Sequence, residues 1–119
     1  MRLTNVTVWT KDPHLLRDWY TEHLGMKVIE DTPRFVLVRG EGGAAIGFHV
    51  GDPLVTPDRV QFHLEVHDVD HEYQRLRAQG VDFEEPPTNR PWGVRSTAAR
   101  DPAGHSVELT TTSVTGASS

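Results

Sequence analysis

The sequence predicts an α+β fold made of two βαβββ repeats, whose curved mixed sheets form a cup while the helices lie on the outer faces. The order strand, helix and three strands occurs twice along the 119 residues. The repeats also share landmark residues, because Asp12 corresponds to Asp68 and Gly43 to Gly104. A repeat alone buries only the sheet face under its single helix. The other faces must therefore meet, curve around a cavity or pair with another chain.

This repeat suggests one structural domain with two modules. We expect the first module at residues 1–50 and the second at residues 59–112. Residues 51–58 contain two prolines and a glycine and are predicted to be a linker. Residues 113–119 are rich in small and polar side chains and are predicted to be a flexible tail.

In the first module, side chains of alternating character predict a strand over residues 2–10. A helix follows, because Asp12 is a suitable N-cap and Pro13 suits the first helical position. Apolar residues recur at helical spacing until Gly25, which is expected to end the helix in the left-handed conformation. Three further strands are predicted between Pro- and Gly-containing breaks, at residues 26–30, 35–39 and 44–50.

The second module repeats this pattern. A strand is predicted over residues 59–66, followed by a helix with Asp68 as its N-cap and Gly80 at its end. We then expect a strand at residues 81–85 and a loop at 86–93. A β-hairpin completes the chain, and its turn is predicted at residues 101–104, where Asp, Pro and Gly occupy the positions that a type I turn favours.

Composition excludes several classes of function. The chain has no cysteine, so disulfide frameworks and cysteine-based metal or redox chemistry are excluded. Its formal net charge is -5 and it contains no basic run, which argues against a nucleic-acid partner. No stretch reaches the length of a membrane span and no signal peptide is visible, so we expect a cytoplasmic protein without a membrane partner.

Several motifs occur at corresponding places in the two repeats or at the closing hairpin. They are Trp19-Tyr20, residues 23–26, residues 64–70, Pro91-Trp92-Gly93, residues 101–105 and Glu108-Leu109. With these motifs, the chain resembles the vicinal oxygen chelate superfamily, which includes glyoxalase I, bleomycin-resistance proteins, fosfomycin-resistance transferases and extradiol dioxygenases. The resemblance is closest to the metal-free antibiotic-binding members, and it implies the paired-module fold described above.

The resemblance also implies four metal-ligand positions, one on the first and one on the last strand of each module. These positions read Asn5, Gly47, Gln61 and Glu108. Metal-using members typically have histidine and glutamate there, whereas amides are poor ligands for transition metals. Only Glu108 is a strong ligand, and a divalent ion needs more than one good side chain. We therefore expect no metal ion and no other cofactor.

Because successive side chains of a strand point to opposite faces, polar, small and aromatic side chains share one face of the predicted strands, where they would line the cup. The predicted ligand-binding residues, none of them catalytic, are Asn5, Thr7, Trp9, His49, Gln61, His63, Glu65, Trp92 and Glu108. Alternatives stay open for three of them. Trp9 could pack beneath a dimer interface, Trp92 could close its own loop, and Glu108 could pair with Arg95 or Gln61.

Two functions fit these observations. The first is a homodimeric, metal-independent protein that binds a bulky aromatic or partly cationic antibiotic or natural product and confers resistance by sequestration. The lack of an obvious nucleophile favours it. The alternative is a glyoxalase- or dioxygenase-like lyase or isomerase acting on a small carbonyl or aromatic substrate. Its metal-free version would use Glu108 as general base and His63 as acid or electrophile.

Overall fold

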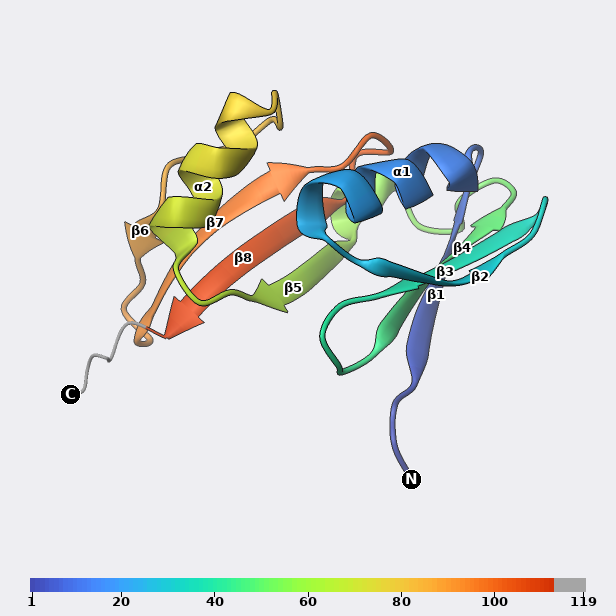
Figure 1. Ribbon diagram of the computed structural model, residues 1–119, viewed down its shortest axis with the longest axis horizontal. Coiled ribbons are helices and arrows are strands. Elements are labelled where there is room, and N and C mark those ends of the chain that lie inside the picture. Colours follow the sequence, from blue (N-terminus) through green and yellow to red (C-terminus); the bar gives the residue numbers. More distant parts are fainter. Residues whose placement is uncertain (113–119) are drawn as a thin grey trace. The chain divides into compact units, whose positions relative to one another are not determined.

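The computed structural model describes residues 1–112, and the chain divides into two compact units between Thr56 and Pro57. Each unit contains one α-helix and one four-stranded mixed sheet (Figure 1). The predicted α+β class and the two βαβββ modules are therefore confirmed. The tail predicted at residues 113–119 lies outside the described residues. The single domain and the cup expected from the sequence stay predictions.

The first module has its strands in the order β1-β4-β3-β2, with β1 parallel to β4 and the other pairs antiparallel. Its elements are β1 (Asn5–Thr10), α1 (Pro13–Leu24), β2 (Lys27–Asp31), β3 (Phe35–Arg39) and β4 (Ala45–Val50). The first strand begins three residues later than predicted. Its partner β4 begins only at Ala45, which pairs with Asn5, so the preceding residues have no strand beside them.

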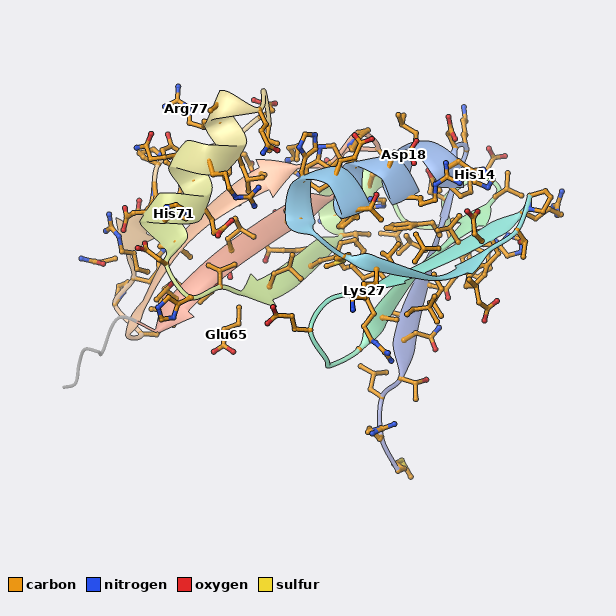
Figure 2. The ribbon with its side chains drawn as sticks, viewed as in Figure 1. His14, Asp18, Lys27, Glu65, His71 and Arg77 are labelled. Carbon is orange, nitrogen blue, oxygen red and sulfur yellow. The ribbon has the colours of Figure 1, made fainter. Side chains whose placement is uncertain are left out.

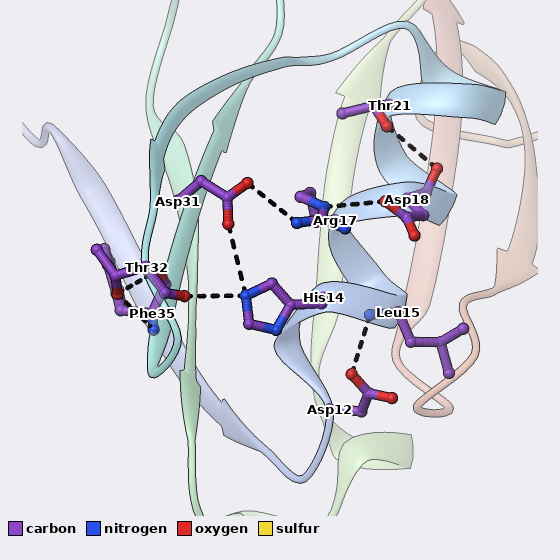
Figure 3. A network of polar contacts seen from close by, with 9 residues as sticks. All are labelled: Asp12, His14, Leu15, Arg17, Asp18, Thr21, Asp31, Thr32 and Phe35. Carbon is purple, nitrogen blue, oxygen red and sulfur yellow. Dashed lines mark hydrogen bonds and ion pairs between the residues drawn. The ribbon is translucent and has the colours of Figure 1, made fainter.

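The ends of α1 follow the predicted capping chemistry. The Asp12 carboxylate accepts a hydrogen bond from the backbone N–H of Leu15 at 3.1 Å. Gly25 ends the helix in the left-handed conformation, with φ of 68°. A polar network ties the first turns of α1 to the end of β2 (Figure 3), where Arg17 donates a hydrogen bond to Asp31 at 3.0 Å. This network fixes the helix along the sheet.

One face of the first sheet forms the core of the module, under α1 (Figure 1). Val36, Val38 and Phe48 on this face have no exposed surface. The ring of Tyr20, which α1 contributes, lies 5.2 Å from the ring of Phe48. Because side chains alternate along a strand, the residues between these apolar ones point to the opposite face, which α1 leaves open.

The second module has its strands in the order β5-β8-β7-β6, with β5 parallel to β8. Its elements are η1 (Pro57–Arg59), β5 (Gln61–Glu65), α2 (Val69–Ala78), β6 (Thr88–Asn89), β7 (Val94–Arg100) and β8 (Ser106–Thr112). The 3-10 helix η1 was not predicted. Asp68 caps α2 as expected, and its carboxylate accepts a hydrogen bond from the N–H of His71 at 3.1 Å.

The strand predicted at residues 81–85 is wrong. This segment makes a single bridge, between Phe83 and Ala99, and the fourth strand of the sheet is β6, inside the loop predicted at residues 86–93. Pairing along β7 is interrupted at Pro86-Pro87, because proline has no N–H to donate to the neighbouring strand. The ladder resumes only after these two residues.

The predicted closing hairpin is confirmed as β7 and β8. Its turn is closed by a hydrogen bond from the Gly104 N–H to the Asp101 carbonyl at 2.9 Å. The buried Asp101 carboxylate also accepts hydrogen bonds from the N–H of Ala103, the N–H of His105 and, at 2.8 Å, His105 Nδ1.

Neither α-helix of residues 1–112 is long and apolar enough to pass through a lipid bilayer.

Candidate functional site

Three aromatic side chains lie in one row on the open face of the first sheet. The strand register pairs Trp9 with His49, and His49 with Phe35. The ring centroids of Trp9 and His49 are 5.5 Å apart, and those of Phe35 and His49 are 6.1 Å apart. The Trp9 side chain is 39% exposed. We call these three residues the aromatic row; it forms a surface on which a planar ring can stack.

Gly47 lies in the next row, beneath the ring of Phe35. A Cβ atom at this position would lie 2.7 Å from Thr7 Oγ1 and 2.8 Å from Phe35 Cε1. The absence of a side chain therefore lets the aromatic ring lie close against the sheet. Asn5, at the end of the same face, donates a long hydrogen bond of 3.5 Å to Thr7 Oγ1.

The open face of the second sheet carries a polar pair. His63 and Glu108 are direct neighbours on β5 and β8, and His63 Nδ1 lies 2.7 Å from Glu108 Oε1. The hydroxyl of Thr110 donates a second hydrogen bond to Glu108 Oε1 at 3.1 Å. The side chain of His63 is 63% exposed and that of Glu108 is 22% exposed. The imidazole is therefore accessible, and the carboxylate beneath it is held in place.

The alternative that Glu108 pairs with Arg95 or Gln61 is wrong, because both residues bind other partners. Gln61 Nε2 instead donates a hydrogen bond to Ser106 Oγ at 2.9 Å. Arg95 lies on the opposite face of the sheet, where its guanidinium binds both carboxylate oxygens of Asp70 at 2.9 and 2.8 Å. The hydrogen bonds from Arg95 hold the pKa of Asp70 below its ordinary value, although this exposed pair is open to screening by salt.

Trp92 and Glu65 are predicted ligand-binding residues of the second module, and both are exposed. Trp92 lies in the turn between β6 and β7, where it is 73% exposed and makes no ring contact with any residue of the described part of the chain. Glu65 lies on the face of the second sheet away from α2 and its His71 (Figure 2). Neither side chain therefore contributes to a core.

The four implied ligand positions do not fit a divalent metal ion. Gly47 supplies no donor, and a carboxylate there would collide with Phe35. The amides of Asn5 and Gln61 are weak ligands and are hydrogen-bonded to neighbouring hydroxyls. Within residues 1–112, no three His, Asp or Glu side chains lie close enough together to hold a metal ion.

Sequence reasoning missed two features. Phe35 has the strand parity of Leu37 and could have been assigned to the open face, but nothing in the sequence indicates that its ring covers Gly47. A shallow hollow of about 590 Å³ also lies beside the first turn of α2. Its lining residues are His67, Asp68, Val69, Asp70, Asn89, Arg95 and Thr111. It lies on the helix side of the second sheet, opposite the face that carries Gln61, His63, Glu65 and Glu108.

Two βαβββ modules, each with a helix on one sheet face and polar or aromatic groups on the other, define a fold that serves small-molecule binding and catalysis. The model of the Glyoxalase/Bleomycin resistance protein/Dioxygenase superfamily matches residues 2–109. The chain belongs to this superfamily, which confirms the resemblance seen in its sequence at that level. No curated protein matches the chain significantly.

Solved structures support the same assignment. A glyoxalase/bleomycin resistance protein/dioxygenase from Nocardioides is 25% identical, with 93% of this chain and 83% of that chain covered and a TM-score of 0.77. TioX from Micromonospora sp. ML1 is 26% identical, with 94% and 99% covered and a TM-score of 0.77. A lactoylglutathione lyase from Agrobacterium tumefaciens shares the fold at 20% identity, with 92% of each chain covered and a TM-score of 0.77.

Proposed function

We propose that this protein binds a planar aromatic antibiotic or natural product and confers resistance by sequestering it, without a metal ion and without turnover. The aromatic row of Trp9, His49 and Phe35 is the observation that carries this proposal. An exposed indole on an open sheet face offers a stacking surface, and stacked rings gain about 0.5–1.5 kcal/mol beyond the area they bury.

The predicted ligand-binding residues divide into two chemical types. In the first module, Thr7, Trp9 and His49 share the face of the aromatic row, with Asn5 at its end. In the second, Gln61, His63, Glu65 and Glu108 share the open face of β5 and β8 and supply polar groups. Trp92 adds a second exposed indole. The face of the first module offers a surface for stacking, and the face of the second module offers groups for hydrogen bonds and for attraction of positive charge.

Fluorescence titration tests the proposal. Trp19→Phe and Trp92→Phe in one background leave Trp9 as the single indole. Intercalating, enediyne-type and glycopeptide antibiotics form the panel. We expect saturable quenching of Trp9 by at least one of them. Trp9→Leu, assayed by equilibrium dialysis, should weaken binding by about 1–3 kcal/mol, which is typical of an aromatic anchor.

Leu15→Ala is the matched control, because it removes an exposed apolar side chain that lies on α1 and not on the open face. Its affinity should equal that of the wild type. Binding that survives Trp9→Leu unchanged, or no binding by any member of the panel, would contradict the proposal. The proposed homodimer is tested separately by light scattering, where the mass of a single chain at micromolar concentration would count against it.

A second candidate function is supported by the contact between His63 and Glu108. A carboxylate that orients an accessible imidazole is a recurring arrangement for proton transfer, so the chain could act as a metal-free lyase or isomerase on a small carbonyl or aromatic substrate. Turnover that is abolished by His63→Leu and retained in Trp9→Leu would favour this enzyme over sequestration.

A further inference from the structure

Three aspartates of this chain are followed directly by proline, in Asp12-Pro13, Asp52-Pro53 and Asp101-Pro102. The peptide bond in such a pair is unusually easy to break in acid. The proline nitrogen is part of a tertiary amide without an N–H, and it takes up a proton more readily than other peptide nitrogens. The neighbouring carboxylate is an internal nucleophile, because it lies on the same residue as the carbonyl carbon that it attacks.

The carboxylates of Asp12 and Asp101 are occupied in the folded protein. Asp12 is the N-cap of α1 and accepts a hydrogen bond from the N–H of Leu15 at 3.1 Å. Asp101 is buried, and its carboxylate accepts hydrogen bonds from two backbone N–H groups and from His105 Nδ1. Either carboxylate must give up these contacts before it can attack its own carbonyl carbon.

Asp52 lies in the segment between β4 and η1, where the surroundings are different. Backbone pairing of the first sheet ends at Gly51, whose N–H donates a hydrogen bond to the carbonyl of Thr10 at 2.9 Å. Residues 52–56 are all exposed and make no hydrogen bond or ion pair within residues 1–112. No such contact therefore prevents the Asp52 carboxylate from turning toward the carbonyl carbon of its own residue.

We propose that in acid the chain cleaves itself between Asp52 and Pro53, whereas the bonds after Asp12 and Asp101 persist as long as the protein is folded. A carboxylate oxygen of Asp52 attacks the backbone carbonyl carbon of the same residue, which forms a C–O bond and a cyclic anhydride. The C–N bond breaks, and its electron pair stays on the proline nitrogen, which takes a proton from the acid. Water then opens the anhydride, so that Asp52 becomes a C-terminal residue.

This cleavage divides the chain between its two modules and leaves every helix and strand of residues 1–112 intact. Residues 1–52 keep α1 and the strands β1 to β4 with the aromatic row, and residues 53–119 keep η1, α2 and the strands β5 to β8. Acid therefore places the two groups of predicted ligand-binding residues on separate peptides. The inference is independent of the proposed function, because it follows from the exposure and hydrogen bonding of the three aspartates.

Mass spectrometry of the full chain tests the proposal. The protein is incubated at the lowest pH at which its circular dichroism spectrum still matches the spectrum at neutral pH. We expect two peptides, residues 1–52 and 53–119, whose masses add up to the intact chain plus one water. The bond after Asp12 should break about fivefold more slowly, the effect of one net hydrogen bond, and the bond after Asp101 more than about a hundredfold more slowly, the effect of three.

Incubation at the same pH in guanidinium chloride is the first control, because unfolding removes the contacts of Asp12 and Asp101. All three bonds should then break at comparable rates, and the folded sample is incubated until the unfolded one has been cleaved. Asp52→Glu is the matched variant, since it keeps the charge but needs one more bond rotation to close a larger ring. It should abolish the two peptides.

Three outcomes would overturn the inference. The first is a folded chain that stays intact after Asp52 while the unfolded chain is cleaved there. The second is cleavage of the folded chain after Asp12 or Asp101 as fast as after Asp52. The third is cleavage of Asp52→Glu at the rate of the wild type, which would show that the Asp52 carboxylate is not the nucleophile.

Discussion

The ring of Phe35 lies across Gly47 on the open face of the first sheet, so closely that a Cβ at residue 47 would be 2.8 Å from Cε1 and 2.9 Å from Cζ of the ring. This contact closes the position at which the resemblance implies a metal-binding glutamate. The same contact holds Phe35 in its place in the aromatic row, because the ring lies against the sheet at Gly47 and beside the ring of His49.

Gly47→Ala should lower the free energy of unfolding by about 1–3 kcal/mol, since the new methyl group must displace Phe35 or Thr7. Urea denaturation measures this loss. Gly40→Ala is the matched control, because its Cβ meets nothing within 4 Å, and it should change the free energy by less than about 0.5 kcal/mol. The cost of Gly47→Ala should shrink in a Phe35→Ala background; an equal cost in both backgrounds would refute the contact.

Trp92→Ala should leave the melting temperature nearly unchanged, because the indole is 73% exposed and packs on no other ring of residues 1–112. The free energy of unfolding should change by less than about 0.5 kcal/mol. Thermal denaturation by circular dichroism measures this. The same variant should bind an aromatic ligand more weakly if the indole contacts it. A large loss of stability with unchanged affinity would identify Trp92 as a packing residue.

Asp101→Asn should destabilise the closing hairpin by about 2–3 kcal/mol. The carboxylate is buried and accepts hydrogen bonds from two backbone N–H groups and from His105, and a carboxamide cannot accept all of them. Chemical denaturation gives the magnitude. Asp52→Asn changes an exposed carboxylate that has no hydrogen-bond or ion-pair partner within residues 1–112, and it should leave the free energy of unfolding unchanged. Equal stability of the two variants would show that the buried pair contributes little.

The pair of Arg95 and Asp70 should make stability depend on pH. Hydrogen bonds from Arg95 lower the pKa of Asp70 in the folded chain, so this contribution is complete above the ordinary carboxyl pKa and is lost as the pH falls through the lowered value. Carboxyl NMR titration should show the pKa of Asp70 rising in Arg95→Gln. Arg39→Gln, at an exposed arginine of β3, should leave it unchanged. High salt should reduce the difference.

Local chemistry explains why much of the fold could be predicted. Asp12 and Gly25 act through their own backbone neighbours, and the Asp101–Gly104 turn closes over four residues, so each is visible in a short stretch of sequence. The misplaced strand at residues 81–85 shows where such reasoning ends. Its alternating pattern was compatible with a strand, but the break at Pro86-Pro87 and the pairing of Thr88–Asn89 depend on where β7 lies.

The candidate site was predicted less completely, because it depends on contacts between distant strands. Parity placed His63 and Glu108 on one face, but their direct contact requires the register of two strands that are 45 residues apart in sequence. Likewise, the ring of Phe35 reaches Gly47 through the register of β3 with β4 and through its own side-chain rotamer. Neither is determined by a local pattern.

The interruption at Pro86-Pro87 also affects how the protein behaves at high concentration. It shortens β6, one of the two edge strands of its sheet, to two residues, so few unpaired backbone groups remain there to recruit another extended chain. In the first sheet, the edge strand β2 is longer, but it carries Lys27, Glu30 and Asp31 and has an irregularity between Val28 and Glu30. Charged residues and bulges on edge strands oppose edge-to-edge aggregation. Both modules should therefore resist fibril growth at β2 and β6.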